Sequence, residues 1–286
     1  MATPQDGAVS AAAGVAAAGV AADQPHITLY WLNESRSQRI VWLLEELGVS
    51  YSIEVFHRTQ DNLAPREFEK IHPLGKFPVV KVTLPEASLA PKKELILAES
   101  GFITEYLCGH FGQEKDLVPS RYPKGGHDGE AGTETESWMR YQYFLHYAEA
   151  SLMPPLVISV ILSVLKGSKV PFFIRPITGA VADKVFAGFV TPTLAKHFAY
   201  LESQLETAPN GGGYLCGKKL TAVDILLVFP LVEAKKGLGH LDMGGGKGKL
   251  RDNFPKLWEY VTRLEAEPGY KRAAAKIEEV EGKPKL

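Results

Sequence analysis

The sequence predicts a two-domain protein, an α/β domain followed by an all-α domain. At 286 residues the chain exceeds the roughly 100 to 200 residues of a typical domain. Strand-like and helix-like patterns alternate up to residue 112, whereas from residue 133 onward the apolar periodicity is helical. The segment between them, residues 113–132, is rich in Gly, Pro and charged side chains, which is typical of a linker.

The composition of the chain excludes several classes of protein. Hydrophobic residues make up 45% of the chain and charged residues 23%, which excludes disorder as a description of the whole chain. The 32 Lys and Arg nearly balance the 33 Asp and Glu without a long basic block, so we expect no nucleic-acid partner. The two cysteines, Cys108 and Cys216, lack metal-ligand spacing, so we expect a reducing, cytoplasmic setting and no metal.

The first 25 residues differ from the rest in composition. They contain the Ala-, Gly- and Val-rich tract Ser10–Ala22, and the first basic residue of the chain is Arg36. A secretory signal needs a basic start and a mitochondrial presequence needs arginines, so neither is expected. The tract is also shorter than the roughly 20 apolar residues of a membrane span. We therefore expect residues 1–25 to form a flexible tail.

The α/β domain begins with a strand, a helix and a second strand. The first strand is predicted at Ile27–Leu32, where β-branched and aromatic residues precede a polar break. Apolar residues then recur at helical spacing from Ile40 to Leu47, and Gly48 is placed to end the helix as a left-handed cap. Alternation over Tyr51–Val55 predicts the second strand.

The rest of the first domain adds a short helix, a hairpin and a final helix. We expect the short helix at Pro65–Ile71, hairpin strands at Phe77–Val82 and Leu95–Ala98, and a helix that begins at Ser100 and ends at Gly109 or Gly112. The resulting order β-α-β-α-β-β-α over residues 27–112 is that of the thioredoxin fold.

The second domain, residues 133–286, is predicted to be all-helical. Helical periodicity covers residues 138–165, 180–205, 223–234 and 255–265. The apolar run Leu152–Leu165 is short for a membrane span and has Pro154 and Pro155 near its start, so we expect a buried bundle helix. Thr221 is predicted to cap a helix, with Asp224 at the third helical position reaching back to free N–H groups.

The order of several motifs carries a family resemblance. Phe77-Pro78, Glu99-Ser100 and the capping segment Leu220–Ile225 follow one another, with Trp31–Glu46, His72–Val79, Ile96–Ile103 and Ser151–Leu156 as further matching stretches. The chain thereby resembles the cytosolic glutathione S-transferase superfamily, in its fungal and bacterial branch, over about residues 26–275. The resemblance implies a thioredoxin-like domain followed by the helical C-terminal domain of that superfamily.

The resemblance also implies a site for the tripeptide glutathione as co-substrate. Pro78 would be cis, so that the backbone of Phe77 pairs with the peptide backbone of the ligand. Ser100, at a helix N-terminus, would cap the helix and bind the γ-glutamyl carboxylate, and Glu99 would attract the amino group. Lys76 would contact the glutathione backbone or the glycyl carboxylate, although a solvated turn lysine fits the sequence as well.

The thiol of glutathione has to be activated, because only the thiolate attacks and a free thiol with a pKa of roughly 8.5 is mostly protonated at neutral pH. Ser35, at the start of the first helix, matches the serine of serine-type transferases. Asn33 and Ser37 lie in the same loop and are alternatives, as is activation by helix N–H groups alone.

The resemblance places a hydrophobic electrophile against the helical domain. Tyr141, Phe144 and Tyr147 form an aromatic stripe at helical spacing that would line this pocket, although such stripes are also typical of a core. We expect a glutathione transferase, with peroxidase activity on organic hydroperoxides as a further possibility of the family. The alternative is a glutathione-binding module without catalysis. A homodimer is implied by the family, and a peripheral place on the endoplasmic reticulum is the alternative to a free cytoplasmic one.

Overall fold

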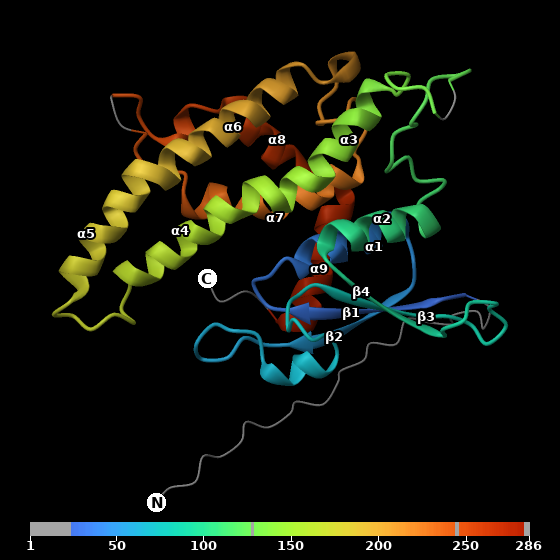
Figure 1. Cartoon of the computed structure of the whole chain (residues 1–286), viewed down its shortest axis with the longest axis horizontal. Helices are drawn as coiled ribbons and strands as arrows, with labels where there is room; N and C mark the ends of the chain where they lie inside the picture. Colours follow the sequence, from blue (N-terminus) through green and yellow to red (C-terminus); the bar gives the residue numbers. More distant parts are fainter. Residues whose placement is uncertain (1–23, 127–128, 244–245, 283–286) are drawn as a thin grey trace, which may run out of the picture.

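A computed structural model describes residues 24–126, 129–243 and 246–282, in two domains (Figure 1). Almost all of the predicted tail, residues 1–25, lies outside the described residues. The strands of the first domain are β1 (His26–Leu32), β2 (Tyr51–Phe56), β3 (Val79–Thr83) and β4 (Glu94–Ala98). Its helices are α1 (Ser37–Leu47), the 3-10 turn η1 (Arg66–Lys70) and α2 (Ser100–Phe111).

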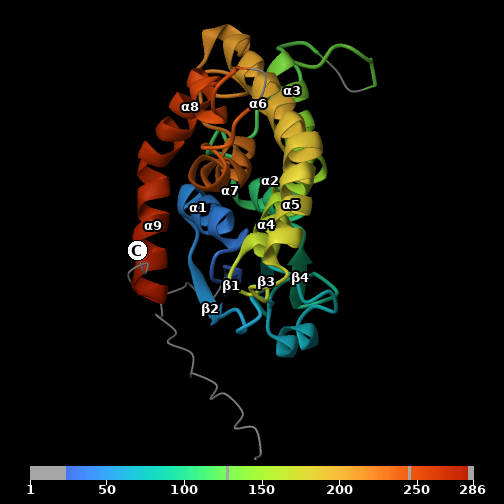
Figure 2. The ribbon, with the colours of Figure 1, turned by 90° about the vertical axis from the view of Figure 1, so that its left-hand side faces the viewer.

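The four strands form one mixed sheet in the order β2-β1-β3-β4. Strand β1 pairs with β2 in parallel and with β3 in antiparallel, and β4 completes a hairpin with β3. Helices α1 and α2 cover one face of the sheet, and η1 covers the other (Figures 1 and 2). The thioredoxin-like order predicted for residues 27–112 is confirmed, with Gly48 in the left-handed conformation after α1.

The second domain is helical throughout its described elements, as predicted. These are α3 (Glu136–Tyr147), η2 (Ala148–Leu152), α4 (Met153–Lys166), α5 (Arg175–Val185), η3 (Phe186–Val190), α6 (Thr191–Glu206), η4 (Pro209–Gly211), α7 (Ala222–Gly237), η5 (Leu250–Asp252), α8 (Pro255–Ala266) and α9 (Pro268–Glu281). The elements η2 and η3 are π-helical turns inside two long helices, so residues 136–166 and 175–206 each run on as one helical rod.

The two domains share a core. Buried apolar side chains of β1, β3 and α1 belong to the same cluster as those of α3, α7 and α8. Helix α9 returns to the first domain and lies along α1, where Tyr270 packs edge-on against Trp42 with ring centroids 5.3 Å apart. A smaller cluster around Tyr30, Phe68 and Phe77 fills the space between the sheet and η1.

The cap predicted at Thr221 is present and is part of a larger buried network. Asp224 accepts hydrogen bonds from the Thr221 backbone N–H at 2.8 Å and from the Thr221 hydroxyl at 2.6 Å. It also accepts from the Tyr260 hydroxyl at 2.6 Å and from the Leu215 N–H at 3.2 Å. Asp224 thus joins α7, α8 and the preceding loop at one buried carboxylate.

The prediction that Leu152–Leu165 forms a buried bundle helix holds for one face of the helix only. Val160 and Ile161 are 64% and 57% exposed, and Val157 and Val164 lie on the same open face. The physical reason is that α4 pairs with α5 in a hairpin that extends beyond the rest of the domain (Figure 1). Within the described residues, the rod Glu136–Lys166 is long and apolar enough to cross a membrane by length and composition, with 39% of its most apolar window buried in the fold.

Candidate active site

A small cavity of about 130 Å³ lies where the first domain meets the helical domain. Its lining comes from the start of α1, the turn before β3, the end of β4 with the start of α2, and η2. The residues are Arg36, His72, Leu74, Lys76, Phe77, Pro78, Ala98, Glu99, Ser100 and Glu149. The predicted site residues Lys76, Phe77, Pro78, Glu99 and Ser100 are therefore brought together at one place.

The Phe77–Pro78 peptide bond is cis, as the resemblance implied. The ladder between β1 and β3 ends at the pair Tyr30–Val79, so the backbone of Phe77 is not part of it. The Phe77 ring stacks on Phe68 with centroids 3.8 Å apart, which turns the side chain into the small core under the sheet. The Phe77 ring is thus held against Phe68, and Phe77 is among the residues that line the cavity.

Glu99 and Ser100 form the wall at the N-terminus of α2. Glu99 is the residue before the helix and has a positive φ of 67°, and Ser100 is the first helical residue and is 3% exposed. The Ser100 hydroxyl lies 3.4 Å from Oε1 of Glu149 and makes no capping hydrogen bond, so the predicted capping role of Ser100 is wrong. The free N–H groups of the first turn and the helix dipole make this end of α2 attractive to an anion.

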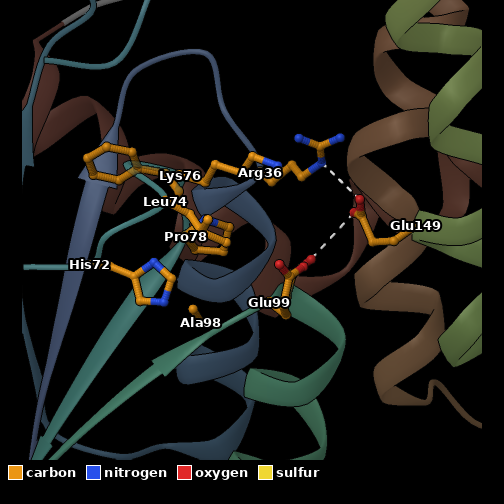
Figure 3. A pocket seen from close by; sticks show the side chains of 10 residues that line it. Arg36, His72, Leu74, Lys76, Pro78, Ala98, Glu99 and Glu149 are labelled. Carbon is orange, nitrogen blue, oxygen red and sulfur yellow. Dashed lines mark hydrogen bonds and ion pairs between the residues drawn. The ribbon is translucent and has the colours of Figure 1, made fainter. Parts of the chain in front are cut away.

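Two arginines of the first domain meet one carboxylate of the helical domain beside this wall. Nη1 of Arg39 donates to Oε1 of Glu149 at 2.7 Å. On the cavity side, Nε of Arg36 lies 3.1 Å from Oε2 of the same carboxylate (Figure 3). Arg39 is 1% exposed, and burial lowers its pKa to about 10, against the opposing effect of Glu149. The Arg39 side chain therefore stays protonated at neutral pH and fixes Glu149 in place.

Sequence reasoning missed both Arg36 and Glu149. Glu149 lies on the π-helical turn η2, which interrupts the long rod where it passes the first domain. Such turns often occur at functional sites. The available signal was an acidic residue two positions before the stretch Ser151–Leu156, which carried part of the family resemblance.

The loop between β1 and α1 is arranged differently from the prediction. The Ser35 hydroxyl donates to the Leu32 carbonyl at 2.7 Å and accepts from the Ser37 N–H at 3.1 Å, so it holds the loop together. Ser37 is fully buried. Of the residues 33–37, Arg36 is the one that lines the small cavity. The structure thus does not bring the Ser35 or Ser37 hydroxyl to the predicted site.

Asn33 lies on the other side of the same loop. Its side-chain oxygen accepts from the Arg58 backbone N–H at 2.8 Å, and the Arg58 guanidinium donates to the carbonyls of Asn33 and Glu34. Asn33 and Glu34 face a second, larger cavity of about 880 Å³ between the first domain and α9. Its lining residues are Trp31, Asn33, Glu34, Gln38, His57, Lys271, Ala274, Ala275, Ile277, Glu278, Glu281 and Gly282.

The aromatic stripe predicted to line an electrophile pocket is part of the core. Tyr141, Phe144 and Tyr147 are 2%, 0% and 4% exposed, and none lines either cavity. Tyr147 packs edge-on against Phe144 with centroids 5.8 Å apart, and its hydroxyl bonds Nδ1 of His197. The prediction is wrong because helical spacing shows that the three residues share a face, but not that this face turns toward α7 and α6.

The cysteines offer no alternative nucleophile. Cys108 and Cys216 are free and buried, and burial raises the pKa of the Cys108 thiol to about 12. Desolvation likewise raises the pKa of Cys216. Both thiols are therefore protonated at neutral pH, as expected of small apolar core residues. Within the described residues no three His, Cys, Asp or Glu side chains form a metal-binding group.

The fold is that of a two-domain protein, with a thioredoxin-like domain and a small cavity where this domain meets the helical domain. Family models agree, matching a glutathione S-transferase N-terminal domain over residues 25–108 and a glutathione S-transferase C-terminal domain over residues 177–275. Glutathione S-transferase 1 of Saccharomyces cerevisiae is 32% identical over 246 residues, covering 86% of this chain and 93% of the relative. The chain therefore belongs to the glutathione S-transferase family and is an enzyme of that family.

Further relatives and solved structures agree with this assignment. Glutathione S-transferase 3 of Schizosaccharomyces pombe is 31% identical, over 73% of this chain and 75% of the relative. A glutathione S-transferase from Actinobacillus pleuropneumoniae is 27% identical with a TM-score of 0.57, covering 87% of this chain and 92% of that one. The fold is shared with the transferase URE2P8 of Phanerochaete chrysosporium, solved with oxidized glutathione, at a TM-score of 0.62 and 17% identity over 90% and 97% of the two chains.

Proposed function

We propose that this enzyme binds glutathione in the small cavity and transfers it, as the thiolate, to hydrophobic electrophiles. One observation carries the proposal: Phe77, Ser100 at the N-terminus of α2 and Arg36 line one cavity. To bind a γ-glutamyl tripeptide as its thiolate, a site needs a backbone edge that pairs with the peptide, a site for its carboxylate and a cation near its sulfur. The transferase structures solved with glutathione in related folds support this choice of ligand.

The charges of the cavity match the charges of glutathione. At neutral pH glutathione carries a γ-glutamyl ammonium, two carboxylates and a thiol. Ser100 and the first turn of α2 suit the γ-glutamyl carboxylate, because N–H groups and the helix dipole converge there. Glu99 and Glu149 flank this end and suit the ammonium. Lys76, exposed in the turn before Phe77, suits the glycyl carboxylate.

Thiol activation is assigned to Arg36 rather than to the predicted Ser35. The Ser35 hydroxyl already donates its proton to the Leu32 carbonyl, whereas the Arg36 side chain lines the cavity at the start of α1. A cation within a few ångströms of a thiol lowers its pKa by favouring the anion. Ser35 acts as a positioning residue, because its hydrogen bonds to Leu32 and Ser37 fix the loop that presents Arg36.

The electrophile is assigned to the larger cavity. Asn33 and Glu34 line it, and Arg36 of the same loop lines the small cavity, so the two cavities lie on either side of one loop. Trp31, Ala274 and Ile277 provide apolar lining, which suits a hydrophobic substrate. This cavity takes the place of the predicted stripe of Tyr141, Phe144 and Tyr147.

Retention on immobilised glutathione, followed by turnover of an aryl halide and of an organic hydroperoxide, tests the proposal. We expect binding and conjugation of the aryl halide. Peroxidase activity uses the same thiolate, so turnover of the hydroperoxide would add that activity to the transferase. Binding without turnover of several electrophiles would contradict the proposal and favour a glutathione-binding module without catalysis.

The oligomeric state and the location stay predictions. A homodimer is supported by apolar side chains exposed on β4, α2 and α3, namely Ile96, Phe102, Met139 and Tyr143. Light scattering of the purified full chain measures the mass directly, and a monomer at micromolar concentration would contradict the dimer. The cytoplasmic location is tested by cell fractionation.

A further inference from the structure

The hairpin of α4 and α5 presents an apolar surface that the fold leaves uncovered. On α4 the exposed residues Val157, Val160, Ile161 and Val164 follow helical spacing and share one face. On α5 the exposed residues are Ile177 and Val181, and Ile174 is exposed just before this helix. At the tip between the helices, Phe172 and Phe173 are 80% and 67% exposed. We call these nine residues the hairpin patch. Exposed apolar patches of this kind mark interaction sites.

The hairpin also has a buried side, so its exposed face is not the result of poor packing. Leu156, Leu162, Ala182 and Phe186 are buried between the two helices and the rest of the domain. The Thr178 hydroxyl donates to the Leu165 carbonyl at 2.8 Å and locks the two helices together near the tip. The hairpin patch is therefore held on a well-packed support that projects from the body of the molecule (Figure 1).

Basic residues lie in the same stretch of sequence as the hairpin patch. Between Val157 and Phe189 the sequence has Lys166, Lys169, Arg175 and Lys184 against the single acid Asp183, a net formal charge of +3 in a chain whose total is −1. Lys166 pairs with Asp183 at 2.6 Å, and Nζ of Lys169 reaches the carbonyl of Gln60 at 3.3 Å. Aromatic tips with lysines and arginines beside them are typical of surfaces that dock on anionic membranes.

We propose that the hairpin patch docks the enzyme on an anionic lipid bilayer, with Phe172 and Phe173 entering the interface and the basic residues facing lipid headgroups. A second copy of this chain is a less suitable occupant, because two patches of like charge would repel when paired. The α3–α4 rod lies on the bilayer rather than across it, since its middle carries Glu149, which is bonded to the buried Arg39.

Co-sedimentation of the full-length protein with vesicles tests the proposal. The probes are vesicles of phosphatidylcholine alone and of phosphatidylcholine mixed with phosphatidylserine. We expect binding to the mixed vesicles that falls as salt is raised, and little binding to phosphatidylcholine alone. The double variant Phe172→Ser/Phe173→Ser is expected to bind at least about tenfold more weakly, since two aromatic side chains no longer leave water. Lys184→Glu is expected to reduce binding by about fivefold or more.

Leu89→Ser is the matched control, because Leu89 is a fully exposed apolar residue on a loop of the other domain. It is expected to bind as the parent does, and far-UV circular dichroism checks that every variant is folded. Failure of the parent to sediment with anionic vesicles at low salt would overturn the proposal, as would parent-like binding by the double variant. A lower mass of the double variant in sedimentation velocity without lipid would overturn it in favour of a contact between copies. None of these readouts depends on catalysis.

Discussion

The carboxylate of Glu149 accepts a 2.7 Å hydrogen bond from the buried guanidinium of Arg39 and so joins the two domains beside the small cavity. The same carboxylate lies 3.1 Å from Nε of Arg36 and 3.4 Å from the Ser100 hydroxyl. One side chain of the helical domain therefore positions the start of α1 and faces the start of α2. The arrangement of the site depends on how the domains pack.

Replacing Glu149 tests this contact. Glu149→Gln leaves the charge of Arg39 buried without its counterion, and we expect the free energy of unfolding to fall by about 2 to 4 kcal/mol. Urea denaturation measures the change. Glu136→Gln is the matched control, because Glu136 pairs with Arg140 at the exposed start of the same rod. Loss of this ion pair is expected to lower the free energy of unfolding by about 0.5 kcal/mol or less. If both variants lost the same free energy of unfolding, Glu149 would contribute no more to stability than an exposed acidic residue.

The carboxylate of Asp224 organises the second domain. Asp224→Ala removes an acceptor from the Thr221 and Leu215 N–H groups and from the Tyr260 hydroxyl, all of which are buried. We expect the free energy of unfolding to fall by about 3 kcal/mol or more, because each buried donor left without an acceptor costs about 1 to 3 kcal/mol. Thermal and urea unfolding measure it, and Asp252→Ala on an exposed turn is the control. A loss below about 1 kcal/mol would contradict the role of Asp224.

The stability of the helical domain is expected to fall in mild acid. Burial lowers the pKa of His197, which is bonded at 2.8 Å to the Tyr147 hydroxyl. Below its ordinary value of 6.5 the unfolded chain binds a proton at this position before the folded chain does, so acid favours unfolding. The stability that depends on a neutral His197 is fully present above pH 6.5, and it is lost as the pH falls toward the pKa of His197 in the folded chain.

Unfolding titrations at several pH values check this sign. His197→Asn should flatten the dependence of the unfolding free energy on pH below 6.5, and His240→Asn, on an exposed turn, is the control substitution. An unaltered slope in the His197 variant would assign the acid sensitivity to other groups.

Much of the fold was predictable, because its signals are local. Alternating and helical apolar patterns, Gly48 after α1 and Asp224 at the start of α7 each depend on neighbours within a few residues. The strand expected from Phe77 begins at Val79, so Phe77 and Pro78 lie outside the ladder. The short helix expected at Pro65–Ile71 is a 3-10 turn over Arg66–Lys70.

The site was predictable only where a motif marked it. Phe77, Pro78, Glu99 and Ser100 come together as expected, because their placement follows from strand and helix ends. Glu149 acts on Arg39 across 110 positions of sequence, and such a contact is set by domain packing. For the same reason periodicity could not show that the face of Tyr141 is core and that the face of Val160 is open.

The assignment of the electrophile to the larger cavity predicts a selective effect on one substrate. Ile277→Trp fills part of the apolar lining, and we expect the KM for a bulky electrophile to rise by about tenfold while the KM for glutathione stays the same. Steady-state kinetics with each substrate varied in turn measure this. Glu279→Trp, on the same helix but outside the lining, is the control. Equal changes in both KM values would place the electrophile elsewhere.

The pKa of the bound thiol tests the central claim most directly, and it is measured from the ultraviolet absorbance of the thiolate as a function of pH in the binary complex with glutathione. Arg36→Met should raise this pKa by about one unit or more, and Arg36→Lys should keep most of the lowering, since the charge is retained. Ser35→Ala should change the pKa less than Arg36→Met does, because its hydroxyl is bonded to Leu32 and Ser37. A large rise in Ser35→Ala together with an unchanged pKa in Arg36→Met would contradict the assignment of Arg36 and restore the serine as the activating group.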